Sequence, residues 1–94
     1  MLIAIMCLDK PGSVDLRMKT RPQHLEWLQG YAASLTYGGP LLGDDGATPI
    51  GSLIIGEFES LEKARAIQKA DPYTIAGLFQ TVTIQPTRKT FPAA

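Results

Sequence analysis

Hydrophobic side chains occupy both the odd and the even positions of the opening segment, Met1 to Leu8. Apolar residues on both faces are typical of a strand that is covered on both sides of its sheet. The segment is therefore predicted to be a central strand. Turn-forming residues follow at 9–13, and the pattern from Val14 to Lys19 predicts only a short, irregular helical turn.

Signals for the start of a longer helix lie near Thr20. Thr20 and Gln23 have the spacing of a capping box, and Pro22 would fall in the first turn, where its missing N–H costs little. A helix is predicted over about residues 21–34. Residues at i, i+4, i+7 and i+11 form its apolar stripe, namely His24, Leu28, Tyr31 and Leu35. His24 is expected to face inward, near a rim.

The middle of the chain has the pattern of a β-hairpin. Residues 36–42 are predicted to form a strand that glycine and proline weaken, so that it lies at an edge or beside a cavity. Residues 43–51, which include Asp45-Gly46, are predicted to be the hairpin loop. The alternating residues from Ser52 to Phe58 predict the returning strand.

A second helix and a last strand complete the pattern. Ser60 is a favourable N-cap, and Pro72 predicts that this helix ends at Asp71, because a residue before proline avoids helical geometry. The buried side of the helix is predicted to consist of Leu61, Ala64, Ile67 and Ala70. Residues 78–85 are predicted to be a strand, with Leu78, Gln80, Val82 and Ile84 on one face and Phe79, Thr81 and Thr83 on the other.

The order strand–helix–strand–strand–helix–strand predicts an α+β fold of the ferredoxin-like split βαβ type (βαββαβ), with an antiparallel sheet and one domain over residues 1–94. Two helices can cover only one face of such a sheet. Since the opening strand is apolar on both faces, a second copy of the chain is expected to cover the other face. The prediction is a homodimer whose sheets pack face to face.

Composition adds little about partners. Nine basic and nine acidic residues are interspersed without a run of either sign, so neither nucleic acid nor an anionic membrane is expected as a partner. The single cysteine, Cys7, is predicted to be a small buried hydrophobe, which fits a reducing, cytoplasmic setting. The opening segment has no basic leader and is too short to cross a bilayer.

The chain contains one histidine, His24, and an aspartate at a turn, Asp71 in Asp71-Pro72-Tyr73. An imidazole can exchange protons near neutral pH, and a bonded carboxylate fixes its tautomer, so the two residues can form an acid–base pair. His24 can equally be a helix-start residue bonded to a backbone carbonyl, and Asp71 a turn residue bonded to nearby amides. No metal-ligand spacing or glycine-rich phosphate loop is present, so no metal or cofactor is expected.

Further candidates for ligand binding are two arginines, a tyrosine and a glycine–proline pair. Arg17 and Arg21 can hold a carboxylate or phenolate through paired donors; the alternatives are solvated charges or ion pairs with Glu26 or Asp15. The hydroxyl of Tyr73 can contact a ligand, or the residue can serve packing alone. The backbone at Gly38, Gly39 and Pro40 can let a ligand approach closely, or can simply bend the strand.

These residues resemble the YCII-related (YciI-like) family, part of the dimeric α/β-barrel group, over nearly the whole length. The resemblance rests on Asp9-Lys10, Arg17, Arg21-Pro22-Gln23-His24-Leu25, Gly39-Pro40-Leu41, the segment 58–64, Asp71-Pro72-Tyr73 and Ala76-Gly77. It implies a ferredoxin-like dimer with a histidine–aspartate pair in a pocket, which corresponds here to His24 and Asp71. The best-known activity in the family is that of a dehydrochlorinase acting on a chlorinated hydroxyquinol, and the fold is shared with muconolactone isomerase-like enzymes.

Two hypotheses for function follow from the residues and the resemblance together. The first is a small enzyme of lyase, isomerase or dehydrochlorinase type, with a small aromatic or hydroxylated substrate. In it His24 is the general acid or base and Asp71 orients it. The second is a non-catalytic ligand-binding or accessory dimer, in which the same pocket only recognises a metabolite.

Overall fold

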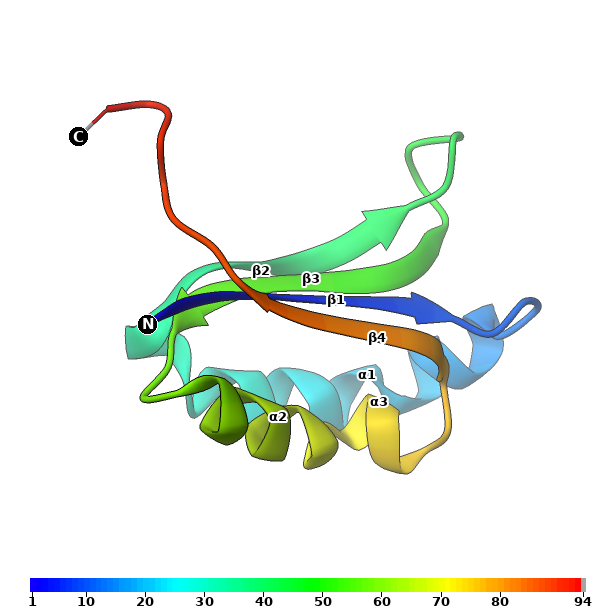
Figure 1. Cartoon of the computed structure of the whole chain (residues 1–94). Coiled ribbons are helices and arrows are strands. Elements are labelled where there is room, and N and C mark those ends of the chain that lie inside the picture. Colours follow the sequence, from blue (N-terminus) through cyan, green and yellow to red (C-terminus); the bar gives the residue numbers. More distant parts are fainter. Residues whose placement is uncertain (94) are drawn as a thin grey trace.

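The computed structural model describes residues 1–93 as a four-stranded antiparallel sheet with helices on one face (Figure 1). The strand order is β2-β3-β1-β4, which confirms the predicted α+β fold and βαββαβ order. The elements are β1 (Leu2–Asp9), α1 (Val14–Gln29), a 3-10 turn (Ala32–Ser34), β2 (Leu35–Leu42), β3 (Pro49–Glu57), α2 (Leu61–Lys69), α3 (Pro72–Ile75) and β4 (Phe79–Pro86).

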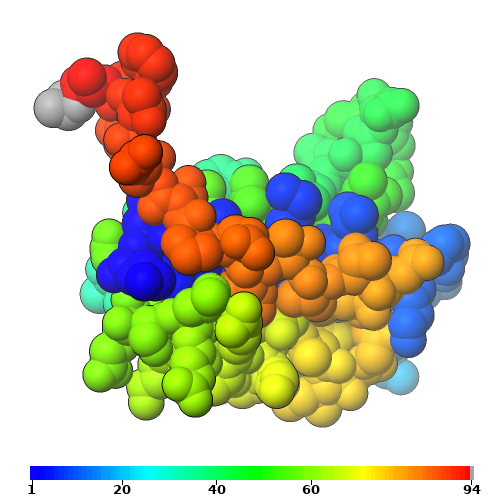
Figure 2. Space-filling model, in the orientation of Figure 1, coloured from blue at the N-terminus to red at the C-terminus, as the bar shows by residue number. Residues whose placement is uncertain are grey.

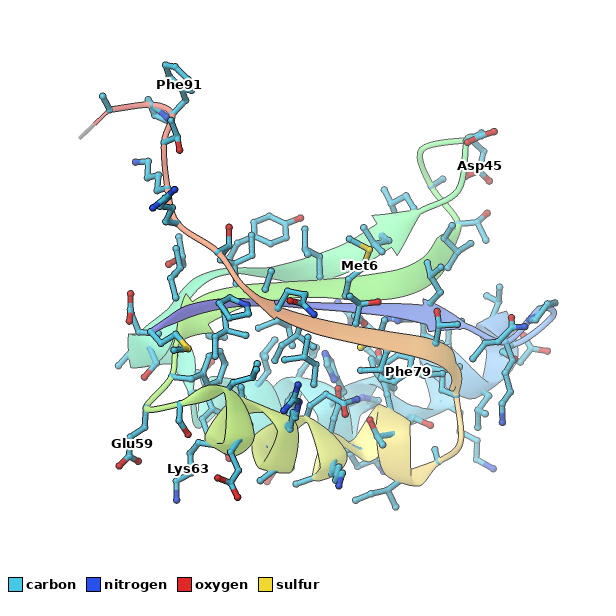
Figure 3. All side chains as sticks on the ribbon, viewed as in Figure 1. Met6, Asp45, Glu59, Lys63, Phe79 and Phe91 are labelled. Atoms are coloured by element: carbon cyan, nitrogen blue, oxygen red, sulfur yellow. The ribbon has the colours of Figure 1, made fainter. Side chains whose placement is uncertain are left out.

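The core lies between the sheet and the helices. β1 is central, as predicted, and directs Ile3, Ile5 and Cys7 toward the helices, where all three are buried. Ile54, Phe58 and Ala64 complete the buried cluster. The alternate residues of β1 point away from the helices: Met6 is 45% exposed and projects from the open side of the sheet in Figure 3. Both faces of β1 are thus apolar, but residues 1–93 cover only one.

The first helix differs from the prediction at both ends. Val14 to Gln29 form one continuous helix, and Thr20 is no cap: its hydroxyl donates a hydrogen bond to the Leu16 carbonyl within the helix. Pro22 therefore lies inside α1 rather than in its first turn. The early turn is helical because tertiary contacts of Arg17 anchor it, and such contacts outweigh local capping signals. Leu35 lies beyond the helix, in β2.

The second helix ends slightly earlier than predicted and buries a different residue. Ser60 is the N-cap, and its side chain accepts a hydrogen bond from the Lys63 amide at 3.0 Å. Ala64 is buried as predicted, but Ala70 is exposed and Gln68 is buried in its place. Gln68 is stable there because its side-chain amide donates to the Thr74 hydroxyl at 2.7 Å.

The last strand contains a bulge that the alternating pattern did not predict. Ile84 lies opposite Ile5, but the register shifts between Leu8 and Asp9, so that Asp9 pairs with Phe79. The shift brings Phe79 to the same face as Ile84, and both pack on the core. The predicted placement of Phe79 on the opposite face was wrong, because an extra residue in one strand inverts the alternation beyond it.

Two segments rise on the open side of the sheet. These are the β2–β3 hairpin, whose loop spans residues 43–48, and the C-terminal segment 87–93 (Figure 1). In Figure 2 the surface dips between them, and atoms of β1 appear there in blue. The hairpin loop is shorter than predicted because β3 begins at Pro49. Within residues 1–93 no helix is both long and apolar enough to cross a membrane.

Candidate functional site

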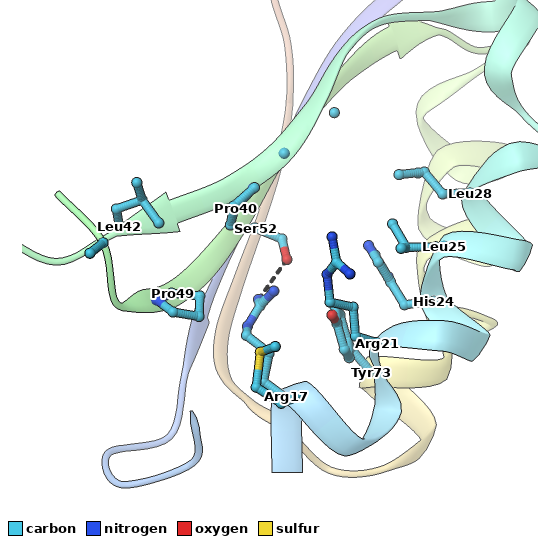
Figure 4. Close-up of a pocket in the computed structure, with 14 residues that line it drawn as sticks. Arg17, Arg21, His24, Leu25, Leu28, Pro40, Leu42, Pro49, Ser52 and Tyr73 are labelled. Carbon is cyan, nitrogen blue, oxygen red and sulfur yellow. Dashed lines mark hydrogen bonds between the residues drawn. The ribbon is translucent and has the colours of Figure 1, made fainter. Parts of the chain in front are cut away.

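A cavity of about 440 Å³ lies between α1 and the β2–β3 half of the sheet (Figure 4). Its walls include every residue predicted to contact a ligand, namely Arg17, Arg21, Gly39, Pro40 and Tyr73, and they include His24. Asp71 lies directly behind His24, outside the lining. The fold therefore brings the predicted residues together from α1, β2 and α3.

His24 and Asp71 lie in contact, as the family resemblance implied. His24 Nδ1 lies 2.8 Å from Asp71 Oδ1, and the two residues are only 7% and 1% exposed. A carboxylate accepts hydrogen bonds only, so we assign the hydrogen to Nδ1. The other ring nitrogen, Nε2, then has its lone pair available on the cavity side, where Figure 4 shows the imidazole.

Asp71 also has the role that was predicted as its alternative, that of a turn residue bonded to a nearby amide. It is the N-cap of α3, and its Oδ1 accepts a hydrogen bond from the Tyr73 amide at 2.9 Å. Pro72 occupies the first turn, where no N–H is needed. A single carboxylate oxygen thus caps the short helix and binds the histidine.

Tyr73 packs against the imidazole and is almost completely buried. Its ring stacks on that of His24 with centroids 4.0 Å apart and an interplanar angle of 17°, and it is 1% exposed. The ring of Phe79 meets the Tyr73 ring edge-on, with centroids 5.9 Å apart. Burial raises the pKa of Tyr73, while the charges of Arg17 and Arg21 act in the opposite direction. The phenol therefore keeps its hydrogen at neutral pH and can donate it.

Arg17 is an internal part of the fold rather than a free cation. Its Nε and Nη2 donate to the two carboxylate oxygens of Asp9 at 2.7 and 3.1 Å, and Nη2 also donates to Ser52 Oγ at 2.7 Å. Its guanidinium lies over the Tyr73 ring, 4.5 Å from the centroid. An ion pair was the predicted alternative for Arg17, with Asp15 or Glu26 as its partner. The partner in the structure is Asp9.

Arg21 lies one helical turn after Arg17 and is exposed. Among residues 1–93 it forms no ion pair and no side-chain hydrogen bond. Figure 4 shows its guanidinium directed into the cavity beside His24. The cavity therefore contains one guanidinium whose donors are free.

The glycine–proline segment of β2 forms part of the wall. Pro40 pairs with Ser52 in the sheet, and both border the cavity. Gly39 contributes backbone only: a Cβ there would lie 3.0 Å from the Tyr37 hydroxyl. At Gly38 a Cβ would instead meet a methyl group of Leu28, also a cavity residue, at 3.4 Å. The missing side chain of Gly38 thus keeps the space between β2 and Leu28 open.

Sequence reasoning missed most of the apolar wall and the partners of Arg17. The additional lining residues are Met18, Leu25, Leu28, Leu42, Ala47, Pro49 and Ser52. Leu25 and Leu28 follow His24 at i+1 and i+4, and the helical spacing of Leu28 was the one signal available. Nothing local in the sequence links Asp9 or Ser52 to Arg17, because both contacts depend on how the strands align.

Cys7 lies beneath the site and takes no part in its charge balance. It is 2% exposed, and burial raises its pKa to about 12, so the thiol stays protonated and unreactive near neutral pH. Within residues 1–93 no group of three or more His, Cys, Asp or Glu side chains is arranged to hold a metal ion.

Relatives with known sequences match nearly all of the chain. A model of the YCII-related domain matches residues 1–88. Protein YciI of Escherichia coli O6:H1 is 40% identical over 98 residues, covering 97% of this chain and 100% of that protein. An uncharacterized protein of Haemophilus influenzae is 33% identical over 98 residues, again covering 97% of this chain and 100% of that protein.

Solved structures give a similar result. The 5-chloro-2-hydroxyhydroquinone dehydrochlorinase of Burkholderia phenoliruptrix, in complex with 2,5-dihydroxybenzoquinone, matches with a TM-score of 0.87 and 34% identity over 94% of each chain. An antibiotic biosynthesis monooxygenase matches with a TM-score of 0.54 and 13% identity over 95% of this chain and 100% of that one, a likeness of fold alone. With the family model matched over residues 1–88 and 40% identity to YciI, the chain belongs to the YCII-related domain family.

Proposed function

We propose that this protein is a small-molecule enzyme of the lyase, isomerase or dehydrochlorinase type, in which His24 and Asp71 act as an acid–base pair. The observation that supports it best is the 2.8 Å contact between His24 Nδ1 and Asp71 Oδ1 at the wall of the 440 Å³ cavity. Cavities of this size and partly apolar lining suit small ligands.

The chemistry follows from the orientation of the imidazole. His24 Nε2 accepts a proton from a hydroxyl or carbon acid of the bound substrate, and Asp71 stabilises the imidazolium that forms. In an isomerisation the same nitrogen returns the proton to another atom of the substrate. In an elimination the leaving group departs with its electron pair, and His24 later releases the proton to solvent.

The similarity to a dehydrochlorinase supports this type of reaction. That enzyme is 34% identical to this chain, and its structure holds 2,5-dihydroxybenzoquinone. A hydroxylated six-membered ring is compatible with a cavity of this volume and with walls that include leucine and proline side chains. We therefore propose small, hydroxylated ring compounds as the substrate class.

The first test replaces each member of the pair by a close isostere. His24→Asn keeps a donor near the Nδ1 position and removes Nε2, while Asp71→Asn keeps an acceptor for the Tyr73 amide and removes the charge. Each variant is expected to lower turnover at least about 10²-fold, the low end for general acid–base catalysis. Chloride release from 5-chloro-2-hydroxyhydroquinone measures it.

Gln23→Ala is the matched control, because Gln23 precedes His24 on α1 but is exposed and outside the cavity wall. It should retain full turnover, and circular dichroism should report the same fold for all variants. Wild-type turnover in folded His24→Asn would rule out the acid–base role. Ring compounds that bind the wild type without any turnover would favour the ligand-binding dimer instead.

A further inference from the structure

The cavity contains two arginines from the same helix in opposite electrostatic situations. Arg17 is 4% exposed, and three hydrogen bonds and an aromatic ring occupy its guanidinium. Asp9 balances its charge across a bidentate contact. Arg17 therefore offers little net charge to a ligand, even though it borders the cavity.

Arg21 contributes the positive charge that remains. A guanidinium is charged at every physiological pH, and that of Arg21 has no carboxylate within ion-pair distance among residues 1–93. It projects into the cavity on the side of the Tyr73 hydroxyl and His24 (Figure 4). Its charge is felt at Tyr73, where it favours the ionised form of the phenol. An incoming anion would meet this charge near both neighbouring groups.

The remaining walls limit what kind of anion fits. Leu25, Leu28 and Pro40 contribute apolar surface, and Gly38 leaves room between the strand and the helix. A compact, strongly hydrated anion such as phosphate would lose its water against these side chains. A flat ring with an ionised oxygen can instead pack its apolar part on the leucines and direct the oxygen to Arg21.

We propose that Arg21 is the specificity-determining residue of this cavity, and that it recognises the ionised oxygen of a planar phenolate, enolate or hydroxyquinone. The Tyr73 hydroxyl donates a second hydrogen bond to the same ligand. Arg17 serves the fold through Asp9 and Ser52 and is not the recognition group. This inference rests on the proposed function in one respect only: the ligand class is that of the proposed substrate.

The experiment is a binding titration with 2,5-dihydroxybenzoquinone, an acidic quinone that is ionised at neutral pH. Arg21→Gln removes the charge and keeps most of the side-chain length. It is expected to weaken binding about 10-fold or more, the effect of losing one hydrogen bond to a charged group. Arg21→Lys keeps the charge but not the paired donors, so its affinity for the quinone should lie between those of the wild type and Arg21→Gln.

Two controls separate specific recognition from general charge. Arg65 lies on α2, borders a different surface and is exposed, so Arg65→Gln should leave the dissociation constant unchanged. 2,5-Dimethoxybenzoquinone has the same ring without an ionisable hydroxyl. Its weaker binding should be the same in the wild type and in Arg21→Gln, because neither can form the charged contact with it.

The outcomes are distinct from those of the acid–base proposal. Equal affinity of the wild type and Arg21→Gln for 2,5-dihydroxybenzoquinone, or no binding by the folded wild type, would overturn the role of Arg21. Binding that depends on Arg21 in a protein without turnover would leave that role intact and remove the catalytic proposal. A loss of turnover in His24→Asn with unchanged quinone binding, together with weaker quinone binding in Arg21→Gln, would support both proposals.

Discussion

Asp71 Oδ1 accepts two hydrogen bonds, one from the Tyr73 amide and one from the His24 imidazole. The first bond belongs to a local turn, so it holds the carboxylate independently of its contact with α1. The imidazole is then held on two sides, by this oxygen and by the ring of Tyr73 at 4.0 Å. An imidazole held on two sides would lose little conformational freedom if it acted as the proposed base.

The buried ion pair of Asp9 and Arg17 gives a prediction about stability. In Asp9→Ala the guanidinium remains buried without its counter-charge, so the free energy of unfolding should fall by about 3–5 kcal/mol. Urea unfolding followed by circular dichroism measures the change. Glu26→Ala, which removes an exposed carboxylate from α1, should change it by less than about 0.5 kcal/mol.

A double variant shows whether the unpaired charge is the cause. Asp9→Ala combined with Arg17→Met removes both charges and keeps an apolar side chain of similar length, so it should recover much of the lost stability. If the double variant is as unstable as Asp9→Ala alone, lost packing rather than buried charge explains the effect.

At the scale of elements, the β2–β3 hairpin depends on one carboxylate. Asp45 Oδ1 accepts hydrogen bonds from the amides of Ala47 and Thr48 at 3.0 and 2.9 Å, and the Thr48 hydroxyl donates to its other oxygen. Gly46, with φ of +67°, completes the turn where other residues would be strained. Because Ala47 borders the cavity, these bonds also define part of its rim.

The same bonds make the loop sensitive to acid. Hydrogen bonds from Thr48 and then Ala47 lower the pKa of Asp45 from 3.8 to about 2. The folded pKa lies below the unfolded one, so the stabilisation is complete above pH 3.8 and is lost as the pH falls through about 2. In NMR spectra the Thr48 amide resonance should therefore shift with pH, with a midpoint at pH about 2, the pKa of Asp45.

Variants identify the carboxylate responsible. Asp45→Ala should abolish this titration and make the loop more sensitive to protease at neutral pH. Asp44→Ala removes a neighbouring exposed carboxylate that makes none of these bonds, and it should preserve the titration. A titration that disappears in Asp44→Ala instead would show that Asp44, not Asp45, is the titrating carboxylate.

Elements whose signals are local could be predicted from the sequence, and those set by distant contacts could not. Ser60 caps α2 as its residue type indicates, and the apolar residues on both faces of β1 are those of a central strand. A short helical turn was predicted from Val14 to Lys19, but not its continuity with the rest of α1. Arg17 in that turn bonds to Ser52, 35 positions away, a contact that no local pattern contains. The bulge opposite Leu8 is likewise set by strand alignment.

The site shows the same division. The pairing of His24 with Asp71 was predictable because the chain has one histidine and because the resemblance supplied its partner. The different states of Arg17 and Arg21 were not, since both are arginines on one helix with similar neighbours in sequence. Only the position of Asp9 at the end of β1, opposite the first turns of α1, separates the buried arginine from the free one.

At the scale of the whole molecule, one face of the sheet has no cover within residues 1–93. Its exposed apolar residues include Met6, Leu8 and Tyr37, each more than 40% exposed. Contiguous apolar surface of this kind is typical of interfaces between subunits. We propose that a second copy covers this face, so that the sheets of a homodimer pack against each other.

Assembly can be tested with two substitutions on opposite sides of the sheet. Light scattering of the wild type at micromolar concentration should give about twice the chain mass of 10.2 kDa. Met6→Lys places a charge at the centre of the open face, and it should shift the protein toward the chain mass because an unpaired charge in an apolar interface is costly. Ile75→Lys changes an apolar side chain that is 74% exposed on α3, on the helical side, and it should leave the dimer intact.

The two variants together identify the face rather than the mere fact of association. If Ile75→Lys dissociates the dimer and Met6→Lys does not, the copies meet through the helices, and the doubly apolar β1 requires another explanation. A wild type that stays monomeric at micromolar concentration would refute the proposed dimer. It would mean that the monomer tolerates Met6 and Leu8 in contact with water. Folded proteins always expose some apolar surface.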